Sequence, residues 1–368
     1  MAAPHAFATE LTVALTAVHA AARVARHVQA TLVPVQDRVI KEDKSPVTVA
    51  DFASQAVVAY YLKRHFATDR IVGEEDAAAV RERPDLAKRV VDAIRHAMVG
   101  EPAAAAVTDD EWLELIDHAS TAARGPVGTT ERFWTLDPID GTKGFLRRQQ
   151  YAVCLALLDA QQTVQVGVLA CPNMPFPSLS TTSSPTAITG SLAWAVRGHG
   201  AWHAPLTDSS DMPTAIPLTV APRTSTTLTV IESYESAHAN HALSQRVQAR
   251  LAVPTAVVRM DSQAKYLAVA RGDAHVYLRV VGDVHYREKI WDHAAGALIV
   301  HEAGAAAVDV TGRALEFPRE GVMVRNVGVV ATVREDGLLE KVVNAVQEDE
   351  VFARYAATVV QSGASPKM

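Results

Sequence analysis

Two aspartates stand three residues apart in the stretch FWTLDPIDGTKGF, residues 133–145. The apolar run at 133–136 predicts a buried strand, so Asp137 and Asp140 follow directly at its end. One interpretation is a turn, because Asp and Gly are common turn formers and the proline between the two acids presets φ. The other interpretation is that the two carboxylates share a cation. This stretch alone leaves both open.

Acidic residues also stand at the ends of three other predicted elements. Asp51 precedes a predicted helix, Glu74 follows a short predicted strand, and Asp292 opens another helix. Each has a simple structural alternative, namely a helix N-cap for Asp51 and Asp292 and a solvated loop for Glu74 with its acidic neighbours. Together they predict one site, because ligands of α/β proteins collect where strands end and helices begin.

The types of donor atom indicate which cation such a site would hold. Carboxylates without His or Cys ligands favour Mg²⁺, and two ions about 3.5–4 Å apart can clamp both oxygens of an in-line phosphoryl displacement. In this arrangement Asp137 bridges the ions, Asp140 reaches one of them, and the Ile139 carbonyl points inward. Gly141 and Thr142 come next, where small residues expose backbone N–H groups that bind an anion.

Several motifs resemble the signature of the inositol-monophosphatase-like, lithium-sensitive Mg²⁺-dependent phosphatases. They are GEE at 73–75, DPIDGT at 137–142 and WDHAAG at 291–296. Three longer stretches are similar to those of the 3′(2′),5′-bisphosphate nucleotidase branch: DKSPVTVAD at 43–51, DSQAKY at 261–266 and YREKIWDHAAG at 286–296. The resemblance runs from the first predicted helix to Gly304. It does not cover the segment 77–128 or the tail after Pro318.

The resemblance implies roles for the acidic residues. The implied metal ligands are Glu74, Asp137, the Ile139 carbonyl, Asp140 and Asp292. Asp51 and Thr142 are the implied catalytic pair, in which the Thr142 hydroxyl accepts a proton from the attacking water and passes its own to Asp51. The implied cofactor is two or three Mg²⁺ ions, and Li⁺ is the implied inhibitor.

The same resemblance implies a nucleotide pocket. Its residues are Gly141, Thr142, His238, Ser262, Lys265 and Arg279. Ser262 and Lys265 are expected on one face of a helix capped by Asp261, where a lysine is also commonly solvated. Arg279 stands in an apolar strand and needs an anionic partner if buried, which a 5′-phosphate or a carboxylate supplies equally well. His241, placed by helical spacing on the same face as His238, is the alternative contact.

The implied activity is removal of the 3′-phosphate from 3′-phosphoadenosine 5′-phosphate, giving AMP, and also from its 5′-phosphosulfate relative. One alternative is an inositol polyphosphate 1-phosphatase, for which the acidic cluster would look the same. Another is a non-catalytic nucleotide sensor. A sensor is expected to lose at least one of the acidic or catalytic residues, and all of them are present in this chain.

Composition limits the other partners. The net charge is −6 and no basic run reaches five residues, which argues against binding a nucleic acid polymer through its phosphate backbone. No apolar run reaches the length of a membrane span, and Cys154 and Cys171 lie in apolar runs typical of buried thiols. A cytoplasmic protein is expected, with organellar targeting as the open alternative. The family implies a monomer or weak dimer that binds a small-molecule nucleotide.

The elements that must position these residues predict two domains. Residues 1–210 are expected to form an α+β domain, with helices on an antiparallel sheet and a helical insertion at about 77–128. Residues 211–368 are expected to form a smaller α/β domain that carries the nucleotide pocket and Asp292. The resemblance implies the same class of fold, a layered αβαβα sandwich like that of inositol monophosphatase.

Overall fold

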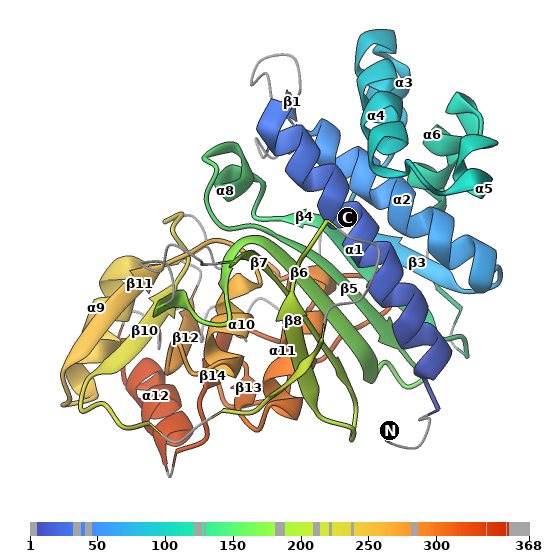
Figure 1. Ribbon diagram of the computed structural model, residues 1–368. Helices are drawn as coiled ribbons and strands as arrows, with labels where there is room; N and C mark the ends of the chain where they lie inside the picture. Colours follow the sequence, from blue (N-terminus) through green and yellow to red (C-terminus); the bar gives the residue numbers. More distant parts are fainter. Residues whose placement is uncertain are drawn as a thin grey trace.

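The computed structural model describes residues 6–31, 38–40, 46–120, 127–128, 130–180, 188–208, 214–220, 223–236, 239–280, 286–335, 337–350 and 352. Its elements form alternating layers of helices and sheets (Figure 1). The site is built where these layers meet.

The larger sheet has seven strands in sequence order. They are β3 (Arg70–Gly73), β4 (Phe133–Asp140), β5 (Ala152–Leu158), β6 (Val164–Phe176), β7 (Ile188–Val196), β8 (Ala201–Pro205) and β9 (Ile216–Leu218). Neighbouring strands are antiparallel except β3 and β4, which run parallel. The expected antiparallel sheet is therefore confirmed apart from this pair, and the exception brings the ends of β3 and β4 to the same edge.

The smaller sheet has five strands in the order β11 (Thr255–Arg259), β10 (Leu228–Glu232), β12 (Val276–Arg279), β14 (Val329–Thr332) and β13 (Ala306–Val308). The first three of these strands are parallel, and the last two join antiparallel. This mixed sheet, with parallel strands β11, β10 and β12, is consistent with the α/β character expected for residues 211–368.

Three layers of helices enclose the two sheets. α1 (Ala8–Thr31) and α2 (Val49–His65) cover one face of the larger sheet, and α10 (Ala264–Ala270) with α11 (Ala294–Glu302) lies between the sheets. α9 (His241–Arg250) and α12 (Leu338–Gln347) lie on the outer side of the smaller sheet (Figure 1). This is the predicted αβαβα sandwich.

Both faces of the larger sheet are buried, which explains the continuous apolar sequence of β5, AVCLALL. Alternate residues contribute to two cores: Trp134 and Leu136 face α1 and α2, whereas Phe133 and Cys154 face α10 and α11. Because one face carries the first helices and the other the second sheet, residues at the end of β4 lie at the junction of all the layers.

Short helices occupy the segment expected to be a helical insertion. Within its described residues these are α3 (Ala78–Arg81), α4 (Pro84–Ala97), α5 (Pro102–Ala105) and α6 (Asp109–His118). α4 and α6 pack on α2, on the side away from the larger sheet (Figure 1). A small hairpin of β1 (Arg38–Ile40) and β2 (Pro46–Thr48) precedes α2. The division into domains at residue 210 stays a prediction. Among the described helices, none has the length and apolar character to cross a membrane.

Candidate active site

The site begins where the parallel strands β3 and β4 end. Gly73 is opposite Leu136 in the register, so Glu74 and Asp137 are the next residues along two neighbouring strands. Burial first, and then the negative charge of Glu74, raises the pKa of Asp137. Glu74 itself is exposed, whereas Asp137 is only 2 % exposed. The predicted ligands therefore differ in access to solvent.

Asp137, Asp140 and Asp292 form a cluster, each offering a carboxylate oxygen within 4.8 Å of those of the others. The register between β4 and β5 shifts between Asp137 and Asp140, and this irregularity brings both side chains to one place. Asp292 comes from the other side, at the end of the 3₁₀ helix η2 (Ile290–Asp292). Of the acids expected to meet here from distant segments, Asp137, Asp140 and Asp292 are thus brought together, whereas Glu74 and Asp51 lie outside this group.

Burial and mutual repulsion disfavour the charged forms of this cluster. Burial, followed by the charges of Glu74 and Asp140, raises the pKa of Asp137 well above its usual value. Burial likewise raises the pKa of Asp140 to about 6 and that of Asp292 to about 7. Three carboxylates at one place are the donor set of a hard divalent cation. The positive charge of such a cation would offset both the loss of hydration and the repulsion between the carboxylates. The residues present therefore fit a metal site.

Asp51 and Thr142 lie next to each other at the edge of this cluster. The Thr142 hydroxyl is 3.3 Å from Asp51 Oδ1 and 3.2 Å from the Ile139 carbonyl oxygen. The other carboxylate oxygen of Asp51 accepts hydrogen bonds from the backbone N–H and the hydroxyl of Thr48, at 2.8 and 2.7 Å. The N-cap assigned to Asp51 from the sequence is wrong, because Thr48 is the N-cap of α2 and Asp51 is the third helical residue of a capping box.

Gly141 turns the chain from β4 into α8 (Thr142–Leu146). Its φ of +86° favours glycine, and a Cβ there would lie 3.1 Å from the Ser262 Cβ. This close approach joins the end of β4 to the segment that begins α10. Gly141, Thr142 and Ser262, all predicted substrate contacts, are therefore neighbours.

The structure differs in three ways from the sequence expectations about α10. The helix begins at Ala264 without a side-chain cap, and Asp261 instead pairs with Arg147. Ser262 lies before the helix at a φ of +68°. Lys265 is not solvated but 2 % exposed, and its ammonium donates to the Ser262 carbonyl at 2.8 Å. Burial lowers the pKa of Lys265 to about 8. The negative charge of Asp140 is the largest of the effects that raise this pKa.

Arg279, at the end of β12, has a carboxylate partner. Its Nε lies 2.8 Å from Glu288 Oε1, and its Nη2 lies 3.2 Å from the Tyr286 hydroxyl. The guanidinium and the carboxylate are both buried. Of the two partners left open by the sequence, a protein carboxylate is thus present, so burial of Arg279 does not by itself require a substrate phosphate.

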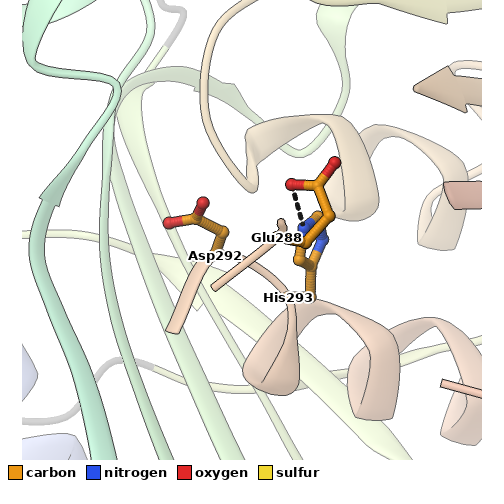
Figure 2. A group of neighbouring side chains, drawn as sticks. All are labelled: Glu288, Asp292 and His293. Atoms are coloured by element: carbon orange, nitrogen blue, oxygen red, sulfur yellow. Dashed lines mark hydrogen bonds and ion pairs between the residues drawn. The ribbon is translucent and has the colours of Figure 1, made fainter. Parts of the chain in front are cut away.

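Glu288 and His293 form a second group with Asp292 (Figure 2). His293 Nε2 lies 3.1 Å from Glu288 Oε2, and its Nδ1 lies 2.8 Å from the Tyr266 hydroxyl. Asp292 extends away from this hydrogen-bonded pair, toward the strands of the larger sheet. Both oxygens of Glu288 are engaged by Arg279 and His293, so this group is a hydrogen-bonded network rather than a free ligand set.

Sequence reasoning missed Glu288. The available signal was the requirement that a buried arginine have an anionic partner, combined with an acid in the motif YREKIWDHAAG.

The histidines expected in the nucleotide pocket are only partly described. His238 lies outside the described residues. The argument that helical spacing places His238 and His241 on one face is wrong, since α9 begins at His241 with Asn240 as its N-cap. His241 Nε2 lies 3.0 Å from the Ser233 carbonyl oxygen, which fixes its ring to the end of β10.

Comparison with known proteins agrees with this architecture. The model of the inositol monophosphatase family matches residues 8–349. A protein of Candida albicans named 3′(2′),5′-bisphosphate nucleotidase 1 is 37% identical over 359 residues, covering 94% of this chain and 96% of the relative. An Arabidopsis thaliana protein of the same name is 41% identical over 308 residues, covering 81% and 85%.

Solved structures share the fold at low identity. The extragenic suppressor protein suhB of Bartonella henselae has a TM-score of 0.59 at 17% identity, covering 92% of this chain and 99% of its own. CysQ of Bacteroides thetaiotaomicron has a TM-score of 0.56 at 18% identity, covering 90% and 99%. The family model matches residues 8–349, and the Candida albicans and Arabidopsis thaliana relatives are 37% and 41% identical to this chain. The chain therefore belongs to the inositol monophosphatase family.

Proposed function

We propose that this protein is a Mg²⁺-dependent phosphatase that removes the 3′-phosphate from 3′-phosphoadenosine 5′-phosphate, giving AMP and phosphate. The observation that carries the proposal is the buried Asp137–Asp140–Asp292 cluster with the Thr142–Asp51 pair at its edge. The substrate is inferred from the relatives, which carry the name bisphosphate nucleotidase along most of the chain. The 5′-phosphosulfate analogue is proposed as a second substrate.

Five groups of this chain are proposed as the metal ligands: Glu74, Asp137, the Ile139 carbonyl, Asp140 and Asp292. When bound, two or three Mg²⁺ ions would supply positive charge for the transferred phosphoryl group and for the leaving oxygen, and would acidify water. Li⁺ is proposed to inhibit by taking one of these positions. The chain's own contribution is to hold the ligands in place before any ion arrives.

Thr142 and Asp51 are proposed to move the proton of the attacking water. As its oxygen forms a bond to the 3′-phosphorus, the water gives a proton to Thr142 Oγ, and Thr142 gives its own to Asp51 Oδ1. The bond between phosphorus and the ribose 3′-oxygen breaks on the opposite side, and that oxygen leaves to be protonated by solvent. The capping box supports this role, because Thr48 donates its hydrogen bonds to Asp51 Oδ2 while Oδ1 faces the Thr142 hydroxyl.

The nucleotide is proposed to bind Gly141, Thr142, His238, Ser262, Lys265 and Arg279. Lys265 and Arg279 are both buried beside the acidic cluster, so they bring positive charge to a region that must accept an anion. Glu288 neutralises part of that charge. We propose a monomer or weak dimer that acts in the cytoplasm on a small molecule, without a nucleic acid or membrane partner.

Phosphate release in Mg²⁺ tests the proposal. We expect much faster release from 3′-phosphoadenosine 5′-phosphate than from inositol 1,4-bisphosphate or fructose 1,6-bisphosphate, and loss of this activity in millimolar Li⁺. Preference for the inositol substrate would retain the metal site and overturn the nucleotide pocket. Binding of the nucleotide without turnover would indicate a sensor and overturn the catalytic assignment.

A further inference from the structure

Gln263 lies between the two chain segments that carry Asp140 and Asp292. Its backbone N–H donates to Asp140 Oδ2. Its side-chain Nε2 donates to the Trp291 carbonyl at 2.6 Å, and its Oε1 accepts the Gly296 N–H at 2.8 Å. The residue is 1 % exposed, so water does not compete for these bonds.

The polarity of these contacts requires an amide. The Trp291 carbonyl can only accept a hydrogen bond and the Gly296 N–H can only donate one, so the side chain between them must present one donor and one acceptor. The backbone carbonyl of Gln263 is used as well, since it accepts the N–H of Tyr266 at 2.9 Å in the first turn of α10. All four polar groups of the residue are therefore engaged.

These contacts link three segments that lie far apart in the sequence. Asp140 ends β4 of the larger sheet, Gln263 directly precedes α10, and Trp291 with Gly296 flanks Asp292 at the junction of η2 and α11. A carbon added at Gly296 would lie 2.5 Å from Tyr266 Cδ2, so α11 can approach α10 closely enough to reach the amide only because glycine stands there.

We propose that Gln263 is a positioning residue that sets the separation of the Asp140 and Asp292 carboxylates and thereby the affinity of the site for its cation. The proposal rests on the proposed metal site but not on the identity of the substrate. Its backbone N–H orients one acid, and its side chain holds the segment that carries the other. Groups that orient metal ligands in this way contribute about tenfold to 100-fold in metal affinity or activity.

Mg²⁺ binding to Gln263→Met tests this role. Methionine has a similar length and shape but can make neither of the two hydrogen bonds that the Gln263 amide makes. By titration calorimetry with MgCl₂ on the substrate-free protein, we expect about tenfold to 100-fold weaker binding than in the wild type. Half-maximal activity should require correspondingly more Mg²⁺, and KM for the nucleotide at saturating Mg²⁺ should change little.

Gln263→Asn is the second variant, in case the apolar replacement does not fold. It retains both amide atoms but is one methylene shorter, so it can reach Trp291 or Gly296 and not both. We expect a Mg²⁺ affinity between those of the wild type and Gln263→Met. Gln248→Leu is the matched control, because Gln248 is also buried and its side-chain amide donates to the Ser244 hydroxyl within α9. It should lose some stability and keep the Mg²⁺ affinity of the wild type.

The outcomes separate this inference from the proposed function. Wild-type Mg²⁺ affinity in folded Gln263→Met or Gln263→Asn would overturn the positioning role. Mg²⁺ binding with the expected ranking of variants, but without nucleotide hydrolysis, would support the positioning role and overturn the proposed substrate. No Mg²⁺ binding by the wild type would overturn both.

Discussion

The hydroxyl of Thr142 lies 3.3 Å from Asp51 Oδ1, although the two residues belong to α8 and α2 and are 91 positions apart in the chain. The carboxylate is 1 % exposed and is held by Thr48 on its other oxygen. Asp51 therefore has two roles: it closes the capping box that begins α2, and it presents its second oxygen to Thr142.

Asp51→Asn separates these two roles. The amide oxygen can still accept from Thr48, so the fold should survive, but the amide nitrogen then faces Thr142 and cannot take its proton. We expect kcat to fall by about 10²–10⁴-fold with KM little changed. Steady-state kinetics and thermal unfolding of the purified variant provide the check.

A second capping box in the same chain is the control for this variant. Thr108 and Glu111 repeat the arrangement at the start of α6, where both residues are exposed. Glu111→Gln should change stability by a similar small amount and leave kcat unchanged. If Asp51→Asn and Glu111→Gln had the same kcat, Asp51 would have only its helix-capping role.

Asp140→Asn should stabilise the metal-free protein while abolishing turnover. Removing one negative charge relieves repulsion with Asp137 and Asp292, and the amide oxygen can still accept from the Gln263 N–H. In EDTA we expect a Tm a few degrees above that of the wild type, and in Mg²⁺ a smaller rise in Tm on adding the ion.

Asp159→Asn is the matched control for that change. Asp159 also follows a strand, but its carboxylate accepts the N–H groups of Gln161 and Thr163 in the turn after β5. Loss of the Asp159 negative charge should lower Tm or leave it unchanged, and the activity should be retained. An Asp140→Asn protein that turned over substrate at the wild-type rate would contradict the metal assignment.

Arg279 and Glu288 should behave as a coupled pair in stability but not in substrate binding. Arg279→Met leaves the Glu288 carboxylate buried without its main partner, which typically costs about 3–5 kcal/mol. Adding Glu288→Gln removes that charge and should restore much of the loss in chemical denaturation. If Arg279 also contacts the nucleotide, KM should remain raised in the double variant.

KM in that double variant decides between the two roles of Arg279. Recovery of both stability and KM would mean that the arginine serves only to neutralise Glu288. Recovery of stability alone would support a contact between Arg279 and the substrate.

His203 should make the protein less stable as the pH falls below neutral. Burial is the main cause that lowers the pKa of this histidine to about 4, and the ring packs against Phe176 with centroids 5.1 Å apart. Between pH 6.5 and pH 4 the unfolded chain binds a proton that the folded state does not, so the free energy of unfolding decreases across this window. The loss amounts to about 2 kcal/mol at pH 5.

His203→Phe isolates this contribution, because it retains an aromatic ring against Phe176 and cannot be protonated. Urea unfolding of both proteins from pH 7.5 to pH 4.5 is the measurement. The difference in unfolding free energy between variant and wild type should grow as the pH falls. A difference that does not depend on pH would show that His203 titrates alike in the folded and unfolded states.

Local sequence signals were sufficient for most strands and for the positions of the acids. An apolar run followed by DPIDGT predicts a strand end with two carboxylates, and the structure has β4 ending at Asp140. A local signal was also available for the start of α2: Thr48 and Asp51 have the spacing of a capping box. It was misread because Asp is itself a common N-cap residue.

Contacts between distant segments could not be read in the same way. Burial of Lys265, pairing of Arg279 with Glu288 and the bonds of Gln263 depend on how α10 and α11 pack between the two sheets. A polar side chain in a motif has the same sequence signature whether it faces solvent, substrate or another segment.

By itself, the sequence determined the strand end that carries Asp137 and Asp140, the family and the set of acids able to bind a cation, because these follow from local pattern and residue type. Only the tertiary structure decided which acids share a space, which carboxylate neutralises Arg279, and that a buried glutamine lies between Asp140 and Asp292. The physical reason is that hydrogen bonding and desolvation act over a few ångströms in space, whereas the groups concerned are up to about a hundred and fifty residues apart along the chain.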